Sequence, residues 1–201
     1  MLKDANGSGV NEKRTKEQHI GYVSDIVTDL TLNWLKNGRD KAKPFMLMCQ
    51  HKAPHRAWDP LPEQYAKYNG VKIPEPETLF EKYTDQVKAR GMNTMTIARH
   101  MRDGYDLKRS NWAPGNLNPT QKEAYLAAFA DENAEYEKNK SSMTADDKTR
   151  WAHQRYAKIY LACIASVDEN VGRVLAYLEE TGLDENTIVI YTSDQGFYLG
   201  E

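Results

Sequence analysis

The chain has 201 residues, and its 27 lysine and arginine side chains nearly balance its 29 aspartate and glutamate side chains, leaving a net charge of −2. This length allows one domain with a proper core, and the balanced charge argues against a general nucleic-acid-binding protein. No window is apolar over the length needed to cross a membrane, and the polar start lacks the apolar centre of a signal peptide. Cys49 and Cys163 are too few for a disulfide framework or a zinc site of the usual spacing.

Apolar periodicity predicts a helix near the start of the chain. Residues 1–18 are polar, and we expect a loop there or the remnant of a strand. From Tyr22 to Trp34 an apolar side chain recurs at every fourth position, which predicts a helix of about 14 residues with one apolar stripe. Ser24 and Asp25 lie near its start, where we expect their side-chain oxygens to cap free backbone amides.

A short apolar run, residues 44–50, follows this helix and predicts a buried strand. A helix, a loop and a strand make half of a βαβ unit, so we predict an α/β fold with a mostly parallel sheet flanked by helices. At the carboxyl end of this strand, residues 51–58 read HKAPHRAW, which includes Lys52 and His55. Such a dense group of cationic and titratable side chains indicates an anion pocket; the alternative is a solvated basic loop.

Residues 59–117 form a proline-rich insert. Its prolines exclude long helices, so we predict an ordered, extended excursion with short turns. Long loops inside compact domains are usually functional, and this one is a candidate for the wall of a substrate cleft. Within the insert, residues 93–102 predict a short helix.

Residues 118–182 are predicted to be helical. Thr120 is the expected N-cap of a first helix, with Glu123 as its capping-box partner. A longer apolar stripe with a spacing of three and four residues begins after Thr144 and stops at Gly182, which predicts a long helix packed against the sheet.

The last stretch, residues 187–201, reads TIVIYTSDQGFYLGE. Its first five residues are β-branched or aromatic and predict a strand buried on both faces. In open α/β sheets ligands bind beyond the carboxyl ends of the strands, and Asp194 and Gln195 follow at that point. A carboxylate and an amide oxygen suit calcium or magnesium, although Ser-Asp-Gln-Gly is also a common turn sequence.

Several segments occur together, in order, as they do in one known family. HKAPHRAW, the Asp-x-x-x-Gly-Arg-Val-Leu segment ending at Leu175 and the Ser-Asp-x-Gly turn near the end resemble the formylglycine-dependent sulfatases of the alkaline phosphatase superfamily. The resemblance covers nearly the whole chain from Tyr22 onward, and the proline-rich insert is most similar to bacterial sulfatases that act on sulfated glycans. It implies a partial alkaline-phosphatase-like sandwich that lacks the first strands and the C-terminal part.

The resemblance also implies roles for individual residues. Asp194 and Gln195 would be metal ligands, usually for calcium, with magnesium possible in its place. His55 would contact the sulfate or the leaving-group oxygen, and the adjacent Lys52 would support the same pocket. The family attacks sulfur with a hydrated formylglycine, so the basic turn and the turn at Asp194 are expected to face a common cavity.

One departure from the family pattern concerns the nucleophile. Neither cysteine begins a Cys-x-Pro-x-Arg motif, and no serine begins the equivalent motif. We therefore expect formylglycine in a missing N-terminal part and interpret residues 1–201 as an incomplete catalytic domain. The isolated chain is expected to be inactive and to bind calcium weakly or not at all.

The implied partner is a sulfated carbohydrate, with neither nucleic acid nor membrane, and the implied location of the full-length protein is periplasmic or extracellular. Two alternatives remain open from the sequence. One is a phosphonate or phosphodiester hydrolase of the same superfamily, which shares the metal turn. The other is a non-catalytic helical interaction module, in which the basic segment binds a partner and Asp194 only forms a turn.

Overall fold

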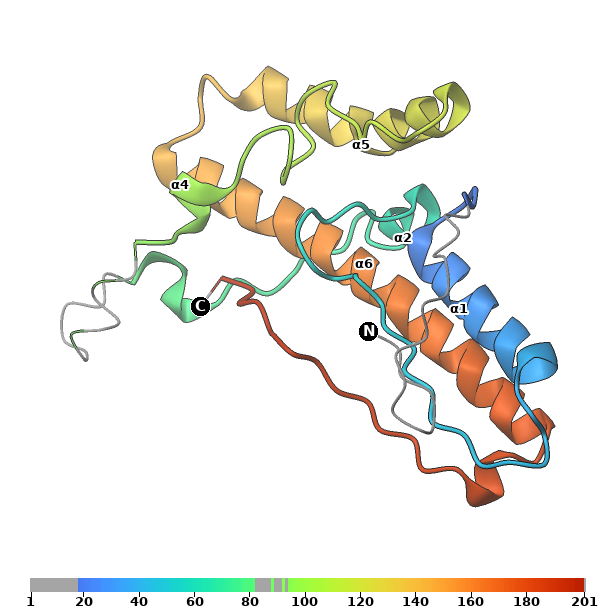
Figure 1. The fold of residues 1–201 in the computed structure, drawn as a ribbon. Coiled ribbons are helices and arrows are strands. Elements are labelled where there is room, and N and C mark those ends of the chain that lie inside the picture. The colour runs from blue at the N-terminus through green and yellow to red at the C-terminus, as the bar shows by residue number, and fades with distance from the viewer. Residues whose placement is uncertain (1–17, 82–87, 89–91, 93, 201) are drawn as a thin grey trace.

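The computed structural model describes residues 18–81, 88, 92 and 94–200, and these are predominantly helical (Figure 1). Most of the segment predicted as a loop or strand remnant, residues 1–18, lies outside this range. The helical elements are α1 (Val23–Asn33), a π-helical turn (Trp34–Gly38), α2 (Pro62–Ala66), a 3-10 turn (Glu77–Phe80), α4 (Ile97–His100), α5 (Pro119–Asn139), α6 (Ala145–Glu180) and a 3-10 turn (Asp184–Asn186).

The 36-residue helix α6 is the axis on which α1, α2 and α4 pack (Figure 1). Thr144 caps it through a reciprocal capping box with Asp147. It ends where Gly182 adopts a φ of +66°, and the amide of Leu183 donates to the carbonyl of Leu178 at 2.9 Å. The predicted start and end of this helix are confirmed.

The core is aromatic and lies between α2, α5 and α6. Tyr65 of α2 packs against Phe129 of α5 with ring centroids 4.7 Å apart, and Tyr136 of α5 packs against Trp151 of α6 at 4.3 Å. Buried aromatic rings of this size contribute much of the apolar area of such a core. No helix in the described part of the chain is both long and apolar enough to cross a membrane.

Helix α1 is confirmed, but its predicted apolar stripe is only partly buried and the predicted cap is wrong. The buried side chains of α1 are small and polar, and their small size lets the backbones of α1 and α6 come close. They are Ser24, Thr28 and Thr31. Leu30, part of the predicted apolar stripe, is 46% exposed. Tyr22 occupies the N-cap position and its side chain makes no capping bond, and Asp25 instead accepts a hydrogen bond from Asn170 Nδ2 at 2.7 Å.

Helix α5 begins two residues earlier than predicted. Asn118, not Thr120, is the N-cap, and its capping-box partner is Gln121 rather than Glu123. The reason is Pro119, whose fixed φ and missing amide suit the first helical position and so place the cap directly before it.

The two predicted strands are not formed in the part of the chain that the structure describes. Residues 44–50 and 187–191 run as irregular stretches (Figure 1), and Met46, Ile188 and Ile190 are 85%, 90% and 80% exposed. A strand needs a neighbour to pair its backbone groups, and neither stretch has one here. The predicted parallel sheet is therefore not present among the described residues.

The proline-rich insert contains short turns, as predicted, and lies against α6. The side-chain amide of Gln154 bonds both backbone groups of Ile73, donating at 2.7 Å and accepting at 2.9 Å. Arg150 pairs with Glu75 at 3.0 Å. In the segment predicted as a helix over 93–102, Asn93 lies outside the described residues, and the helix is the single turn of α4, capped by Thr96.

Candidate active site

The basic turn, residues 51–58, exposes the two side chains that the sequence marks as site candidates. The amide of His55 donates to the carbonyl of Lys52 at 2.9 Å, which closes the turn. Lys52 and His55 both face solvent. His55 Nδ1 donates to the carbonyl of Arg56, so the other ring nitrogen, Nε2, is the one available to a ligand.

Arg56 anchors this turn to the insert. Its Nε donates to Asp106 Oδ1 at 2.7 Å, and its Nη2 bonds the second carboxylate oxygen and the carbonyl of His100. The Asp106 side chain is fully buried and also accepts from the amide of Arg102 at 2.8 Å. The hydrogen bonds and charge of Asp106 raise the pKa of Arg56 further above its ordinary value.

Trp58 and Asp59 fix the end of the basic turn. Trp58 is buried, donates from Nε1 to the carbonyl of Pro54 at 2.8 Å, and packs against Tyr156 of α6 with centroids 4.9 Å apart. Asp59 accepts from the buried Lys108 ammonium at 2.7 Å. Desolvation lowers the pKa of Lys108, and the negative charge of Asp59 opposes that change.

The acidic turn, residues 193–196, exposes Asp194 and Gln195. The Ser193 hydroxyl holds it, donating to the carbonyl of Gln195 at 2.5 Å and accepting from the amide of the same residue at 3.3 Å. Both candidate ligand side chains face solvent. Exposed carboxylate and amide oxygens fit a hard divalent cation, although two ligands are fewer than the roughly six to eight that calcium takes.

The described residues supply no larger group of metal ligands around Asp194 and Gln195. Among the residues with described positions, no group of three or more His, Cys, Asp or Glu side chains is placed to hold a metal ion. Asp194 and Gln195 can thus contribute to a metal site, with further ligands required from elsewhere.

The two turns are joined through aromatic packing. Phe197, three residues after Asp194, lies with its ring centroid 5.3 Å from that of Trp58, which is three residues after His55. Beyond Phe197, Tyr156 donates its hydroxyl to the carbonyl of Tyr198 at 2.7 Å. The structure therefore brings the segments that carry the basic and acidic turns together on α6.

The residues that follow Tyr198 also lie against α6. His153 Nε2 donates to the carbonyl of Leu199 at 2.8 Å. Gly200 follows with a φ of +120°, and a side chain there would meet His153 at 2.9 Å and Pro76 at 3.0 Å. Only glycine fits this close approach, so the end of the described chain is held firmly against the helix.

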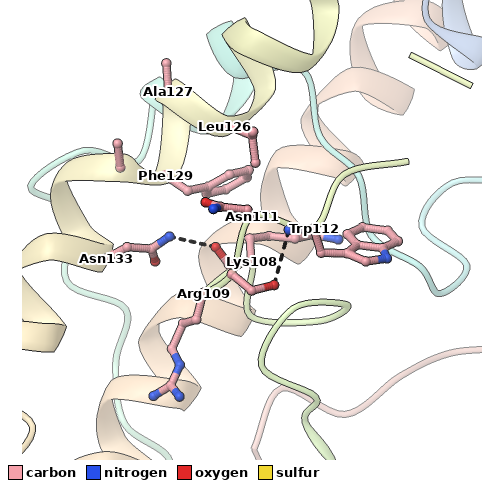
Figure 2. Close-up of a pocket in the computed structure, with 10 residues that line it drawn as sticks. Lys108, Arg109, Asn111, Trp112, Leu126, Ala127, Phe129 and Asn133 are labelled. Atoms are coloured by element: carbon pink, nitrogen blue, oxygen red, sulfur yellow. Dashed lines mark hydrogen bonds between the residues drawn. The ribbon is translucent and has the colours of Figure 1, made fainter. Parts of the chain in front are cut away.

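A cavity of about 340 Å3 lies apart from both turns, between α5 and the loop at 108–112 (Figure 2). Lys108, Trp112, Phe129 and Asn133 are among its lining residues. Asn133 already donates to the carbonyl of Lys108 at 2.7 Å, and Lys108 is already paired with Asp59. None of the four candidate site residues lines this cavity.

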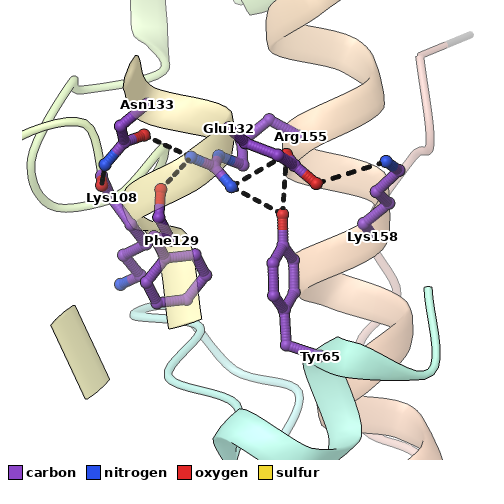
Figure 3. Close-up of polar contacts among 7 residues, drawn as sticks. All are labelled: Tyr65, Lys108, Phe129, Glu132, Asn133, Arg155 and Lys158. Carbon is purple, nitrogen blue, oxygen red and sulfur yellow. Dashed lines mark hydrogen bonds and ion pairs between the residues drawn. The ribbon is translucent and has the colours of Figure 1, made fainter. Parts of the chain in front are cut away.

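A polar cluster ties α2, α5 and α6 together (Figure 3). Arg155 of α6 is buried and donates from Nη1 to the Tyr65 hydroxyl at 2.6 Å and to Glu132 at 2.9 Å. Its Nη2 bonds the Asn133 side chain, and Lys158 lies 3.5 Å from Glu132. This cluster and the Arg56 anchor escape sequence reasoning, because their partners lie far apart in the chain and no local pattern links them.

Comparison with known proteins gives a consistent result. A family model described as Sulfatase matches residues 3–201. An N-acetylglucosamine-6-O-sulfatase of Bacteroides thetaiotaomicron is 40% identical over 194 residues, which cover 90% of this chain and 34% of the relative. An arylsulfatase of Volvox carteri is 24% identical over 183 residues, covering 89% of this chain and 23% of the relative.

A solved structure is also similar. BT4656, in complex with its substrate D-glucosamine-2-N,6-O-disulfate, matches with a TM-score of 0.83 and 38% identity, covering 91% of this chain and 39% of that one. The chain thus spans less than half the length of each of these proteins.

Proposed function

This chain belongs to the sulfatase family, and from that premise we propose that the protein hydrolyses a sulfate ester of a sulfated carbohydrate. The observation that carries the proposal is the 40% identity, over 90% of the chain, to an N-acetylglucosamine-6-O-sulfatase. The similarity to a structure solved with a sulfated glucosamine supports the same substrate class. A sugar sulfated at the 6-position of glucosamine is the first candidate substrate.

The basic turn is proposed to bind the sulfate. His55 is the catalytic residue that contacts the ester, with Nε2 facing the leaving-group oxygen, and Lys52 adds positive charge close by. The contact between Trp58 and Phe197 supports this assignment, because it holds the basic turn and the acidic turn on the same helix. A positively charged, preorganised pocket favours the charge that develops as the sulfuryl group is transferred.

The acidic turn is proposed to hold the metal. Asp194 and Gln195 would give two oxygen ligands to a calcium ion, or to magnesium in its place. A divalent cation bound there would offset negative charge on the transferred group. The exposure of both side chains at the surface of the turn supports this role.

The nucleophile is proposed to lie outside this sequence. The family's formylglycine derives from a Cys-x-Pro-x-Arg or Ser-x-Pro-x-Arg motif, and residues 1–201 contain neither. Because the chain spans 34% of the length of its N-acetylglucosamine-6-O-sulfatase relative, the remaining residues of the protein have room for it. Residues 44–50 and 187–191 are likewise proposed to join a mostly parallel sheet that other segments complete. The family resemblance is the basis for proposing a periplasmic or extracellular location.

The proposal is tested by assaying the protein at its full length on 6-O-sulfated N-acetylglucosamine. Wild type is expected to release sulfate, and His55→Ala is expected to lower kcat by about 100- to 10,000-fold, since the leaving oxygen loses its proton donor. His19→Ala is the matched control, because this exposed histidine lies outside both turns, and its activity should stay within about twofold. Turnover of phosphodiesters or phosphonates without turnover of any sulfate ester would contradict the assignment.

The metal site has its own test in the same protein. Asp194→Asn should weaken calcium binding, measured by titration calorimetry, and sulfate release should fall with it. Asp184→Asn, an equal charge change in the exposed 3-10 turn, is the control. Calcium affinity that is equal in the two variants would remove Asp194 from the site.

A further inference from the structure

We propose that the ion pair between Arg56 and Asp106 positions His55, by fixing the backbone carbonyl to which the imidazole is bonded. This inference rests on the proposed function, since it gives His55 a catalytic task, but it concerns Asp106, which no family motif in the chain includes, and Arg56, to which the resemblance assigns no role. Arg56 and Asp106 are positioning residues: neither is inferred to touch the substrate.

Asp106 is a rigid anchor. Its side chain has no exposed area, and it accepts two hydrogen bonds from Arg56 and one from the amide of Arg102. A buried carboxylate is stable only when such donors satisfy it, so its place is fixed by all of them together. The anchor lies 50 residues along the chain from the turn that it holds.

Arg56 has little freedom to move away from Asp106. The guanidinium bonds the carboxylate through two nitrogens, which fixes its plane as well as its distance. The rings of Trp58 and Tyr105 lie with their centroids 5.8 Å from the guanidinium carbon, and the carbonyl of His100 accepts a further bond at 3.1 Å. These contacts of the Arg56 side chain therefore also restrain the Arg56 backbone.

A hydrogen bond joins the Arg56 backbone to the His55 ring. The Arg56 carbonyl can only accept, so His55 Nδ1 carries the proton in that bond. Nε2 is then left to face outward from the turn, and a protonated imidazole can give up the Nε2 proton while its Nδ1 bond stays in place. A shift of the Arg56 backbone would release the ring, and misplacement by about 1 Å is enough to cost about 100-fold in rate.

The experiment compares Arg56→Lys and Asp106→Asn with Asp103→Asn in the protein at its full length. Asp103 pairs with Arg109 in the same loop but is 63% exposed, so its variant removes an equal charge without touching the anchor. Arg56→Lys keeps the positive charge but loses the two-nitrogen bond to Asp106. Both anchor variants are expected to lower kcat for 6-O-sulfated N-acetylglucosamine by about 10- to 100-fold with little change in KM, while Asp103→Asn stays within about twofold.

A second readout is independent of turnover. The imidazole nitrogen spectrum of His55, assigned by its absence from His55→Gln, should show a proton held on Nδ1 in wild type and in Asp103→Asn. It should show exchange between both ring nitrogens in Arg56→Lys. If Asp106→Asn fails to fold, Arg56→Lys decides, because it leaves a cation beside the buried carboxylate.

The outcomes separate this inference from the function on which it rests. Wild-type kcat and an unchanged His55 spectrum in Arg56→Lys would overturn the positioning role, even if His55→Ala is inactive. Full activity in His55→Ala would instead overturn the catalytic role of His55, whatever the spectrum of Arg56→Lys shows.

Discussion

Cys163 is buried in the core, whereas the four candidate site residues are exposed. Its side chain is 2% exposed on α6, and burial, together with the negative charge of Asp59, raises the pKa of its thiol from 9.0 to about 12. The unfolded thiol ionises near its ordinary pKa and the folded thiol does not. Its contribution to stability is therefore complete below pH 9 and is lost as the pH rises toward 12.

A thiol-labelling experiment tests this burial. In a Cys49→Ser variant at pH 8, Cys163 is expected to react with a thiol reagent at least about 100-fold more slowly in the native protein than in urea, because both access and thiolate are lacking. The complementary Cys163→Ser variant, which keeps the half-buried Cys49, is the control. Native labelling of Cys163 at the rate of the unfolded protein would show that the core around it opens.

At the scale of the element, the packing of α2 and α5 on α6 depends on the buried guanidinium of Arg155. Arg155 donates to Tyr65, Glu132 and Asn133 at once, and each of the three would lose one hydrogen bond if it were truncated (Figure 3). Breaking a buried ion pair by removing one partner is strongly destabilising, even though Lys158 still lies near Glu132. The cluster therefore holds α2 and α5 to α6 only as long as it is complete.

Arg155→Ala is accordingly expected to lower the free energy of unfolding by about 3 kcal/mol, measured by urea denaturation. Arg173→Ala is the comparison on the same helix: its pair with Asp29 is 43% and 63% exposed, and the loss should stay below about 1 kcal/mol. Equal losses in the two variants would mean that the buried cluster contributes no more than a surface ion pair.

The elements that the sequence predicts are those whose signals are local. Thr144 and Gly182 bound α6 as expected, because a cap and a left-handed glycine act within a few residues. The buried face of α1 is not predictable from its apolar stripe, since the choice of Ser24 and Thr28 depends on how closely α6 approaches. Nor does periodicity reveal whether a strand has a neighbour.

The candidate site is likewise predictable only where its signals are local in the sequence. Lys52, His55, Asp194 and Gln195 lie in two turns, as the sequence predicts, because each turn is encoded by adjacent residues. Their roles as ligand and metal contacts remain predictions. The anchor at Asp106 has no adjacent signal: its partner is 50 positions away, and only the folded chain brings the two together.

At the scale of the whole molecule, exposed apolar side chains concentrate on the two extended stretches. Met46, Met48, Ile188, Ile190 and Tyr191 are each more than two-thirds exposed. Apolar area of this kind marks a surface that is normally covered, or one that associates.

The isolated 201-residue chain is therefore expected to bind the dye ANS strongly and to release no sulfate from 6-O-sulfated N-acetylglucosamine. Ile188→Lys with Ile190→Lys should lower the dye fluorescence, because it removes apolar area, whereas Asn186→Lys with Thr192→Lys adds the same charge to exposed positions and should not. Appreciable sulfate release by the isolated chain would contradict the proposal that the nucleophile lies elsewhere.

The contact between Trp58 and Phe197 has an optical consequence. An indole ring emits according to its surroundings, and this one lies against the segment that carries the acidic turn. If Asp194 binds a cation as proposed, we expect the position of Phe197, three residues away, to change with it. The emission of Trp58 is then expected to report on the acidic turn from the end of the basic turn.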